Sequence, residues 1–126
     1  MNVPDDRRYT EEHEWVLVEG DGTAKVGITD YAQEALGDVV FVDLPEAGRA
    51  AAADESVAEV ESTKSVAEVY APIAGTIAEV NAELEGRPEL VNDDPYGAGW
   101  FFTITPGDPA AIDSLLDAAG YRALLD

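Results

Sequence analysis

Short runs in which apolar and polar residues alternate follow one another along most of the chain. Glycines and prolines separate these runs, and such alternation is typical of β-strands with one buried face. We therefore expect strands at residues 15–19, 23–28, 39–44, 56–62, 65–70, 75–81 and 100–105. Many short strands of this kind predict a mainly β domain that closes as a small barrel or sandwich.

Two segments depart from the alternation and are expected to be helical. Residues 30–37 form the first, with Asp30 suited to its N-terminal cap and Gly37 to its C-terminal cap. The second starts at Asp108, has proline at its first helical position, and continues with apolar residues at helical spacing until Gly120. The sequence therefore predicts one short inserted helix and one C-terminal helix.

A five-residue repeat predicts a β-hairpin. Residues 56–60 recur word for word as residues 65–69, with only four residues between the two copies. An antiparallel hairpin centred between Thr63 and Lys64 would pair Ser62 with Ser65, Val60 with Ala67 and Ala58 with Val69. The opposite face would then carry Glu59 facing Glu68, a like-charge pair that salt would screen.

Length and charge limit the classes of partner. The chain has 126 residues, 27 acidic and 7 basic, with a formal net charge of -20. The length fits a single domain over residues 1–126, and the charge excludes nucleic acids and anionic membranes as favoured partners. Because the N-terminus lacks a basic stretch followed by an apolar run, and no segment is long enough to span a membrane, we expect a cytoplasmic protein.

The acidic residues are spread over the whole chain, which contains only two lysines, Lys25 and Lys64. We interpret most of this acid as adaptation to a cytoplasm rich in salt. At about 1 M salt the Debye length is roughly 3 Å, so neighbouring carboxylates hardly repel one another. The interpretation predicts a halophilic source and a loss of cooperative folding in dilute buffer.

The residues that most catalytic sites need are missing. Cysteine is absent and His13 is the only histidine, which excludes thiolate nucleophiles, thiolate zinc sites and multi-histidine metal sites. A Ser/His/Asp triad would have to be built on His13 without a nucleophile-elbow motif. Asp93 and Asp94, beside Pro95, indicate a turn rather than a pair of metal ligands. We expect no catalytic residue and no metal.

Lys64 is the candidate for chemistry, because it lies at the tip of the predicted hairpin. An enzyme could reach its amine there from nearly any direction, and acylation would place a flexible arm on a rigid base, as in a group carrier. A solvated turn residue is an equally good interpretation of the hairpin alone. Lys25, inside an alternating run, is expected to be an outward strand residue.

Five blocks of sequence carry a more specific signal. Residues 61–65 read Glu-Ser-Thr-Lys-Ser, and residues 69–75 read Val-Tyr-Ala-Pro-Ile-Ala-Gly. Residues 13–16, 26–38 and 91–100 contain His-Glu-Trp-Val, Thr-Asp-Tyr-Ala-Gln and Asn-Asp-Asp-Pro-Tyr-Gly. In their order along the chain the blocks resemble the glycine cleavage system H protein family, and the blocks at residues 61–65 and 69–75 resemble its lipoyl-attachment hairpin.

The resemblance implies a barrel-sandwich hybrid, like that of lipoyl and biotinyl carriers, with lipoic acid covalently attached to the ε-amine of Lys64. It also implies that Glu61 and Ser62 serve recognition by the lipoylating enzyme. Glu14 is a candidate for the surface cleft that shelters the loaded arm, where it could accept a hydrogen bond from the aminomethyl ammonium. The alternative is that Glu14 is an exposed acid.

The resemblance implies a carrier without catalysis of its own. Its partners would be the pyridoxal-phosphate glycine decarboxylase (P protein), the tetrahydrofolate-dependent aminomethyltransferase (T protein) and dihydrolipoamide dehydrogenase (L protein). The carrier would take the aminomethyl group of glycine from the first to the second, and the third would reoxidise the arm. Two alternatives stay open: an H-like lipoyl donor or scaffold in lipoate metabolism, and an interaction module in which Lys64 is never modified.

Overall fold

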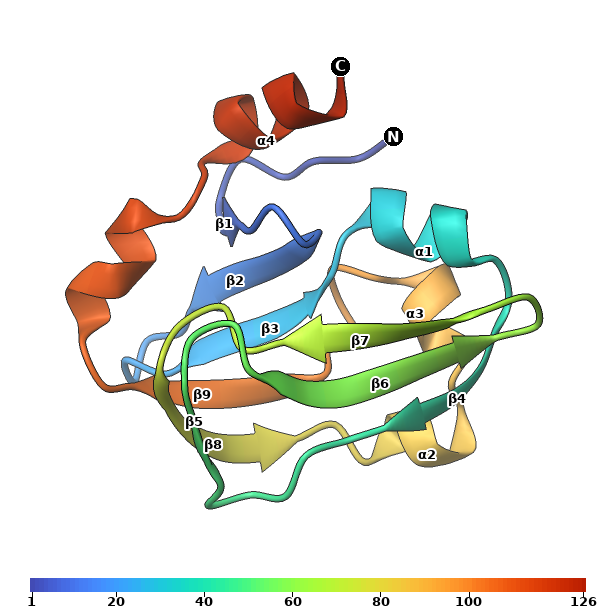
Figure 1. Ribbon diagram of the computed structural model, residues 1–126, viewed down its shortest axis with the longest axis horizontal. Coiled ribbons are helices and arrows are strands. Elements are labelled where there is room, and N and C mark those ends of the chain that lie inside the picture. The colour runs from blue at the N-terminus through green and yellow to red at the C-terminus, as the bar shows by residue number, and fades with distance from the viewer.

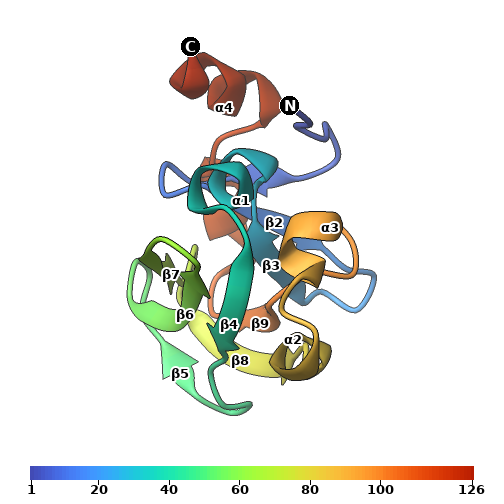
Figure 2. The ribbon, with the colours of Figure 1, turned by 90° about the vertical axis from the view of Figure 1, so that its right-hand side faces the viewer.

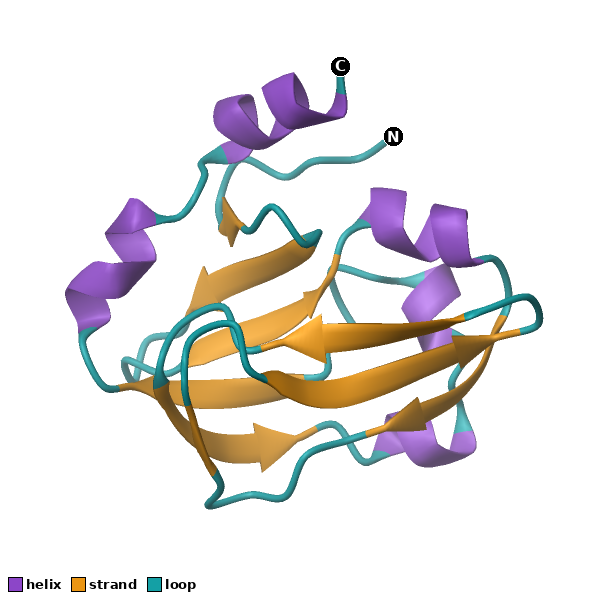
Figure 3. Cartoon of the chain, in the orientation of Figure 1, coloured by secondary structure: helices purple, strands orange, loops and turns teal.

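The computed structural model describes residues 1–126 as a mainly β molecule with small helices at its margins (Figures 1 and 3). The strands are β1 (Arg8–Tyr9), β2 (Glu14–Val18), β3 (Ala24–Ile28), β4 (Val39–Asp43), β5 (Ala50–Ala51), β6 (Ser56–Ser62), β7 (Val66–Tyr70), β8 (Gly75–Val80) and β9 (Phe102–Pro106). The helices are α1 (Asp30–Leu36), α2 (Glu83–Gly86), α3 (Leu90–Asp93) and α4 (Ala118–Leu125), together with the 3-10 helix η1 (Pro109–Ser114). No helix is long and apolar enough to cross a membrane.

The strands form two antiparallel sheets that pack against each other. One sheet has the strand order β1-β2-β3-β9-β8-β5, and the other has the order β4-β6-β7. Figures 1 and 2 show the three-stranded sheet lying across one face of the larger sheet. A core of 22 buried residues fills the space between them, with Val26 and Ile104 from one sheet and Val42 and Val60 from the other. Neither sheet closes into a barrel by itself.

All seven predicted strands are present, with ends that differ from the expected ones by no more than two residues. Two strands of two residues each, β1 and β5, give too little alternation to be recognised in the sequence. The expectation of only two helical segments is wrong, because α2 and α3 are also helical. These single turns of four residues are too short to show a helical period.

The predicted hairpin has the expected register. Residues Ala58 and Val69, and likewise Val60 and Ala67, face each other between β6 and β7. The main-chain N–H of Ser62 donates to the carbonyl of Ser65 at 2.8 Å, which closes the hairpin beyond the last strand pair. The two apolar pairs line the inner face, so Lys64 lies at the tip as expected.

Helix α1 begins one residue earlier than its predicted cap implies. Thr29, and not Asp30, is the N-cap, because the Thr29 hydroxyl accepts a hydrogen bond from the main-chain N–H of Ala32. Asp30 lies in the first turn, where its carboxylate accepts from the side-chain amide of Gln33 at 2.8 Å. Gly37 ends the helix as expected, with a positive φ of 82°.

The prediction of one continuous C-terminal helix is wrong. Asp108 does cap a helix, but this is the 3-10 helix η1, which ends where Leu115 turns extended. Leu116 then exchanges two main-chain hydrogen bonds with Tyr9 of β1, at 2.8 and 2.9 Å. A second helix, α4, starts after Asp117, so Gly120 lies inside it. Pairing with a distant strand therefore interrupts the helical pattern.

Helix α4 covers a second, smaller core near both termini (Figure 1). The ring of Tyr121 stacks on that of Tyr9, with centroids 4.8 Å apart, and Trp15 is fully buried beside them. This small core holds in place the segment between β1 and β2, which carries residues 10–13.

Candidate functional site

The tip of the β6–β7 hairpin presents Lys64 to solvent. Lys64 is exposed and takes part in none of the ion pairs of the structure. The main-chain N–H of Thr63 donates to the carbonyl of Asp38 at 3.0 Å, so the tip is tied to the segment that follows α1. A Cβ atom at Gly37 would lie 3.4 Å from Cε of Lys64. The stem of Lys64 thus lies against a glycine, while its amine is unpaired.

Ser62 shapes the turn that carries Lys64. Its Oγ accepts hydrogen bonds from the main-chain N–H of Ser65 at 3.0 Å and of Lys64 at 3.2 Å. Serine hydroxyls stabilise tight turns in this way, so Ser62 supports the tight turn at Thr63 and Lys64. The sequence indicated Ser62 only for recognition by a lipoylating enzyme, and that role stays a prediction.

Glu61 lies on the outer face of the hairpin, away from the core. It pairs with Phe41 of β4 on one side and with Val66 of β7 on the other. Its carboxylate forms no ion pair and is partly exposed, so it is available to a partner. The predicted role of Glu61 in recognition stays a prediction.

A cavity of about 270 Å³ opens beside the hairpin, and we call it the hairpin cavity. It begins at Ser65, next to Lys64, and runs along β7 toward the segment that precedes β2. Most of its wall is apolar, and the complete lining is Glu12, His13, Glu14, Ile28, Tyr31, Ala32, Ala35, Leu36, Val60, Ser65, Ala67, Glu68 and Val69. Its mostly apolar lining suits an apolar chain that starts at the neighbouring Lys64.

Glu14 is the buried acid of the hairpin cavity. Only 2% of the residue is exposed, so the alternative that it is an exposed acid is wrong. One carboxylate oxygen accepts from the hydroxyl of Thr10 at 2.8 Å, and the other accepts from the main-chain N–H of Tyr70 at 2.9 Å. Burial raises the pKa of Glu14 to about 7, although these two hydrogen bonds act to lower it.

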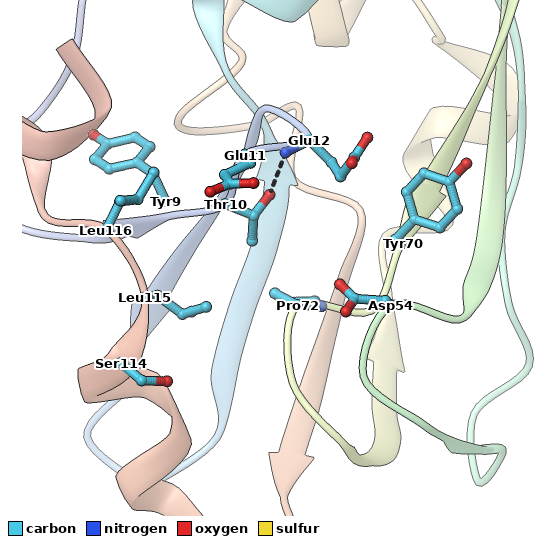
Figure 4. Close-up of a pocket in the computed structure, with 10 residues that line it drawn as sticks. All are labelled: Tyr9, Thr10, Glu11, Glu12, Asp54, Tyr70, Pro72, Ser114, Leu115 and Leu116. Atoms are coloured by element: carbon cyan, nitrogen blue, oxygen red, sulfur yellow. Dashed lines mark hydrogen bonds between the residues drawn. The ribbon is translucent and has the colours of Figure 1, made fainter. Parts of the chain in front are cut away.

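Thr10 fixes the orientation of the Glu14 carboxylate, and sequence reasoning missed it. The Thr10 hydroxyl accepts from the main-chain N–H groups of Glu12 and Glu14, each at 3.2 Å (Figure 4 shows the first). Because the hydroxyl oxygen already accepts these two hydrogen bonds, the single hydroxyl proton of Thr10 is left to donate to Glu14. The only signal in the sequence is that Thr10 precedes Glu14 by four residues, a spacing at which a turn can bring a hydroxyl to a carboxylate.

His13 is held by hydrogen bonding and ring contacts. Its Nδ1 lies 2.8 Å from the hydroxyl of Tyr121, and its ring lies 4.6 Å from that of Tyr31, centroid to centroid. Partial burial lowers the pKa of His13, which favours the neutral ring. His13 adopts a positive φ of 68°, so this contact network fixes an unusual backbone conformation between Glu12 and Glu14.

A second cavity, of about 440 Å³, lies at the base of the same hairpin (Figure 4). Thr10 and Tyr70, the two donors to Glu14, both line it, and it shares Glu12 with the hairpin cavity. Its wall also includes Asp54 and Leu115. Although it is larger, no residue of the hairpin tip lines it, whereas Ser65, next to Lys64, lines the hairpin cavity. The hairpin cavity is therefore the better candidate for a site that serves this lysine.

The aspartates near Pro95 have structural positions. Asp93 ends helix α3, and the carboxylate of Asp94 accepts from the main-chain N–H of Ala98 at 2.9 Å. The interpretation of this segment as a turn is confirmed for Asp94. No group of three or more His, Asp or Glu residues is placed so that it could hold a metal ion.

Comparison with known proteins gives one consistent result. The family model described as "Glycine cleavage H-protein" matches residues 7–126. A glycine cleavage system H protein from Thermus thermophilus is 59% identical over 126 residues, which cover 100% of this chain and 98% of the relative. One from Mycobacterium avium is 58% identical over 128 residues, covering 98% of this chain and 97% of the relative.

A solved structure agrees with the sequence relatives. The crystal structure of a glycine cleavage system H protein from Mycobacterium marinum matches with a TM-score of 0.87 and 47% sequence identity. The match covers 96% of this chain and 97% of the other. The two-sheet architecture described above is therefore the barrel-sandwich hybrid that the family resemblance implied.

Proposed function

Because the chain belongs to the glycine cleavage H-protein family, it is a lipoyl carrier of the glycine cleavage system, and we propose that Lys64 bears its lipoyl group. The observation that carries this proposal is the placement of Lys64, which is exposed and unpaired at the tip of the hairpin. Hydrogen bonds to the Ser62 hydroxyl and to the carbonyl of Asp38 hold the main chain of this tip in place. The only other lysine, Lys25, lies in β3 and pairs with Glu19 at 3.1 Å.

The residues around Lys64 fit a lipoyl arm. The ε-amine of Lys64 would form the amide bond to it, and the apolar wall of the hairpin cavity would shelter its hydrocarbon chain from water. The arm supplies sulfur chemistry that a chain without cysteine lacks. Leu36 and Val60 are among the residues that would exclude water there.

Glu14 is proposed to hold the cationic end of the carried group. Its carboxylate lines the hairpin cavity and is fixed at both oxygens, so it is ready to accept a further hydrogen bond from an ammonium group. An ammonium beside it would favour its ionised form, because an opposite charge lowers the pKa of a carboxyl group. Water exclusion by the apolar wall would strengthen this contact.

Glu61 and Ser62 are proposed to serve recognition by the lipoylating enzyme, Ser62 through the shape of the turn and Glu61 through its outward carboxylate. The further proposed partners are glycine decarboxylase, aminomethyltransferase and dihydrolipoamide dehydrogenase. In this system the chain acts as a non-catalytic carrier that takes the aminomethyl group of glycine from the first enzyme to the second. We further propose that residues 1–126 form a single lipoyl-carrier domain.

The test is the intact mass of the protein purified from its native host, with peptide mapping of the segment that holds Lys64. The expected result is one added lipoyl group on Lys64. Lys64→Arg should abolish the modification, whereas Lys25→Arg, the matched control, should retain it. An unmodified Lys64 in cells grown with glycine as nitrogen source would contradict the proposal and favour an interaction module.

A second test separates glycine cleavage from lipoate donation, because Lys64 would serve both. Purified lipoylated protein is assayed with glycine decarboxylase for glycine-dependent release of carbon dioxide. Release that requires the lipoylated protein supports the proposal. Passage of the lipoyl group to other carriers without such release would instead favour the donor role.

A further inference from the structure

Asn92 belongs to the sequence block at residues 91–100 and does not line the hairpin cavity. It lies in the single turn α3, where its neighbours Leu90 and Val91 are buried in the main core and anchor the turn. Helix α3 packs beside α1 (Figures 1 and 2). A firmly anchored element thus presents Asn92 to the helix that forms one wall of the hairpin cavity.

The side-chain amide of Asn92 joins three separate groups around the end of α1. Its Oδ1 accepts a hydrogen bond from the main-chain N–H of Val39 at 2.8 Å. Its Nδ2 donates to the carbonyl of Gly37 at 2.9 Å and to Oε1 of Gln33 at 3.0 Å. The two main-chain partners fix the orientation of the amide, because an N–H can only donate and a carbonyl can only accept. An aspartate in this place would keep the acceptor and lose both donors.

The segment that Asn92 holds, residues 37–39, also holds the hairpin tip. Asp38 is the one residue between Gly37 and Val39, and its carbonyl accepts from the main-chain N–H of Thr63 at 3.0 Å. A Cβ atom at Gly37 would lie 3.4 Å from Cε of Lys64, so the stem of this lysine lies against the same segment. Helix α1 and the attachment lysine are therefore joined through three residues, and Asn92 holds both ends of them.

The position of this segment determines how the start of an arm on Lys64 faces the hairpin cavity. Ala35 and Leu36, at the end of α1, line the cavity, and Gly37 follows them directly. A shift of residues 37–39 would move the tip relative to this wall. An arm with many rotatable bonds would then be directed less well along the wall, and small misplacements of this kind have large effects on positioned groups.

We propose that Asn92 is a positioning residue of the carrier. It holds residues 37–39 so that the arm on Lys64 enters the hairpin cavity and its cargo is kept from water. This inference rests on the proposed function, since it requires a lipoyl arm on Lys64. Asn92 acts through the segment that it holds and not by contact with the arm.

The test variant is Asn92→Asp, which removes the two donors and keeps the acceptor. The matched control is Asn81→Asp, because Nδ2 of Asn81 also donates twice, to the carbonyls of Ala98 and Trp100, both at 2.8 Å. Asn81 is 6% exposed and does not line the hairpin cavity. The control therefore loses the same kind of hydrogen bonds at a place that does not hold the tip.

The first experiment follows amide hydrogen exchange by NMR in the unlipoylated protein. We expect exchange at Thr63 to be about tenfold faster in Asn92→Asp than in the wild type, because the Asp38 carbonyl is no longer held in place. Exchange at Ser62, which donates to Ser65 within the hairpin, should stay the same. The Asn81→Asp control should leave both rates unchanged.

The second experiment measures how fast the loaded protein loses its cargo to water after glycine decarboxylase has been removed and without aminomethyltransferase. In this loss the bond between carbon and sulfur breaks, and one water molecule is consumed to give a free thiol, formaldehyde and ammonia. Formaldehyde release measures the rate under conditions in which all the proteins are folded. We expect the rate to be about tenfold higher in Asn92→Asp, and unchanged in Asn81→Asp.

Gln33→Met is a second variant in case Asn92→Asp folds poorly. It removes one acceptor of Asn92 and keeps a good helix former in α1, so both rates should rise by about threefold. Unchanged rates in a folded variant, or an equal rise in Asn81→Asp, would overturn the inference. Faster exchange at Thr63 without faster loss of cargo would also overturn it, because the tip would then not direct the arm.

The two experiments separate this inference from the proposed function. If wild-type Lys64 carries no lipoyl group, the proposed function fails. Hydrogen exchange in the unlipoylated protein still decides whether Asn92 holds the tip.

Discussion

The two ends of the hairpin cavity differ in how they position a functional group. At one end Lys64 is exposed, and neighbours in the same turn hold its main chain through the hydroxyl of Ser62. At the other end Glu14 is buried, and contacts from two other segments hold its side chain through Thr10 and Tyr70. The group that we propose to carry the arm is left open, whereas the group that we propose to hold the cargo is enclosed.

This difference has an energetic basis. An exposed lysine keeps its hydration, so its position costs the protein little. A buried carboxylate loses hydration, and this loss is the main cause of the raised pKa of Glu14. The protein thus has a stability cost at the Glu14 end of the cavity and almost none at the Lys64 end, and four experiments can test this contrast.

The largest expected effect comes from salt. In dilute buffer the facing carboxylates Glu59 and Glu68 of the hairpin repel each other with little screening, as do other acids of a chain with net charge -20. We expect cooperative folding to be lost in dilute buffer and restored in molar salt. Thermal melts followed by circular dichroism in both buffers measure this. A melting temperature that is the same in both would contradict the interpretation of the acid as salt adaptation.

The next effect concerns pH and Glu14. Its pKa is raised from 4.5 in the unfolded chain to about 7 in the folded protein, so the folded state binds the proton more tightly. This tighter proton binding adds about 3 kcal/mol to the free energy of unfolding below pH 4.5. The contribution is lost as the pH rises to about 7. Denaturant unfolding of wild type and Glu14→Gln between pH 5 and 8 measures it.

The Glu14→Gln variant should lack this part of the pH dependence, because glutamine does not titrate. Because the two proteins differ only at position 14, the other titrating groups contribute equally to both curves. Parallel stability curves for the two proteins between pH 5 and 8 would show that Glu14 is not desolvated as the structure indicates.

A smaller effect is expected at Thr10. Thr10→Val removes the hydroxyl that donates to Glu14, so the pKa of Glu14 should rise by about one further unit. Carbon-13 NMR titration of the Glu14 carboxyl in the unlipoylated protein measures the shift. Thr10→Ser keeps the hydroxyl and should restore the wild-type value. If both variants show the same pKa, Thr10 does not act through its hydrogen bond.

The smallest effect is expected at the exposed end. Ser62→Ala removes the acceptor for the main-chain N–H groups of Lys64 and Ser65 in a solvent-exposed turn. Water can replace that acceptor, so we expect a loss of only about 1 kcal/mol in the free energy of unfolding. Denaturant unfolding measures it, with Ser114→Ala in η1 as an exposed serine control. A loss as large as that linked to Glu14 would erase the contrast between the two ends.

The sequence predicted what depends on near neighbours. The repeat around Lys64 was sufficient for the hairpin register, because both strands lie within fifteen residues and the alternation of Ala58, Val60, Ala67 and Val69 selects the inner face. Helix α1 was also expected, although its cap was assigned to Asp30, since Thr29 and Asp30 are both common N-caps.

The sequence could not predict what depends on distant contacts. The family resemblance singled out Glu14, but local spacing could not show that it is buried, because the main-chain group of Tyr70 that binds it lies 56 residues away. The C-terminal helix was expected to continue because its apolar spacing is helical, but Leu116 pairs with Tyr9 instead. In both places a tertiary contact determines a structure that local spacing leaves open.

The hydrogen bond between Glu14 and the main chain of Tyr70 also bears on self-association. Strand β7 is the edge of its three-stranded sheet, and the unpaired groups of an edge strand are a template on which another copy can add a strand. Here a side-chain carboxylate occupies the donor at the end of β7, and Glu68 brings a second negative charge to the same strand. The acid that we propose to bind the cargo therefore also protects the open edge against aggregation.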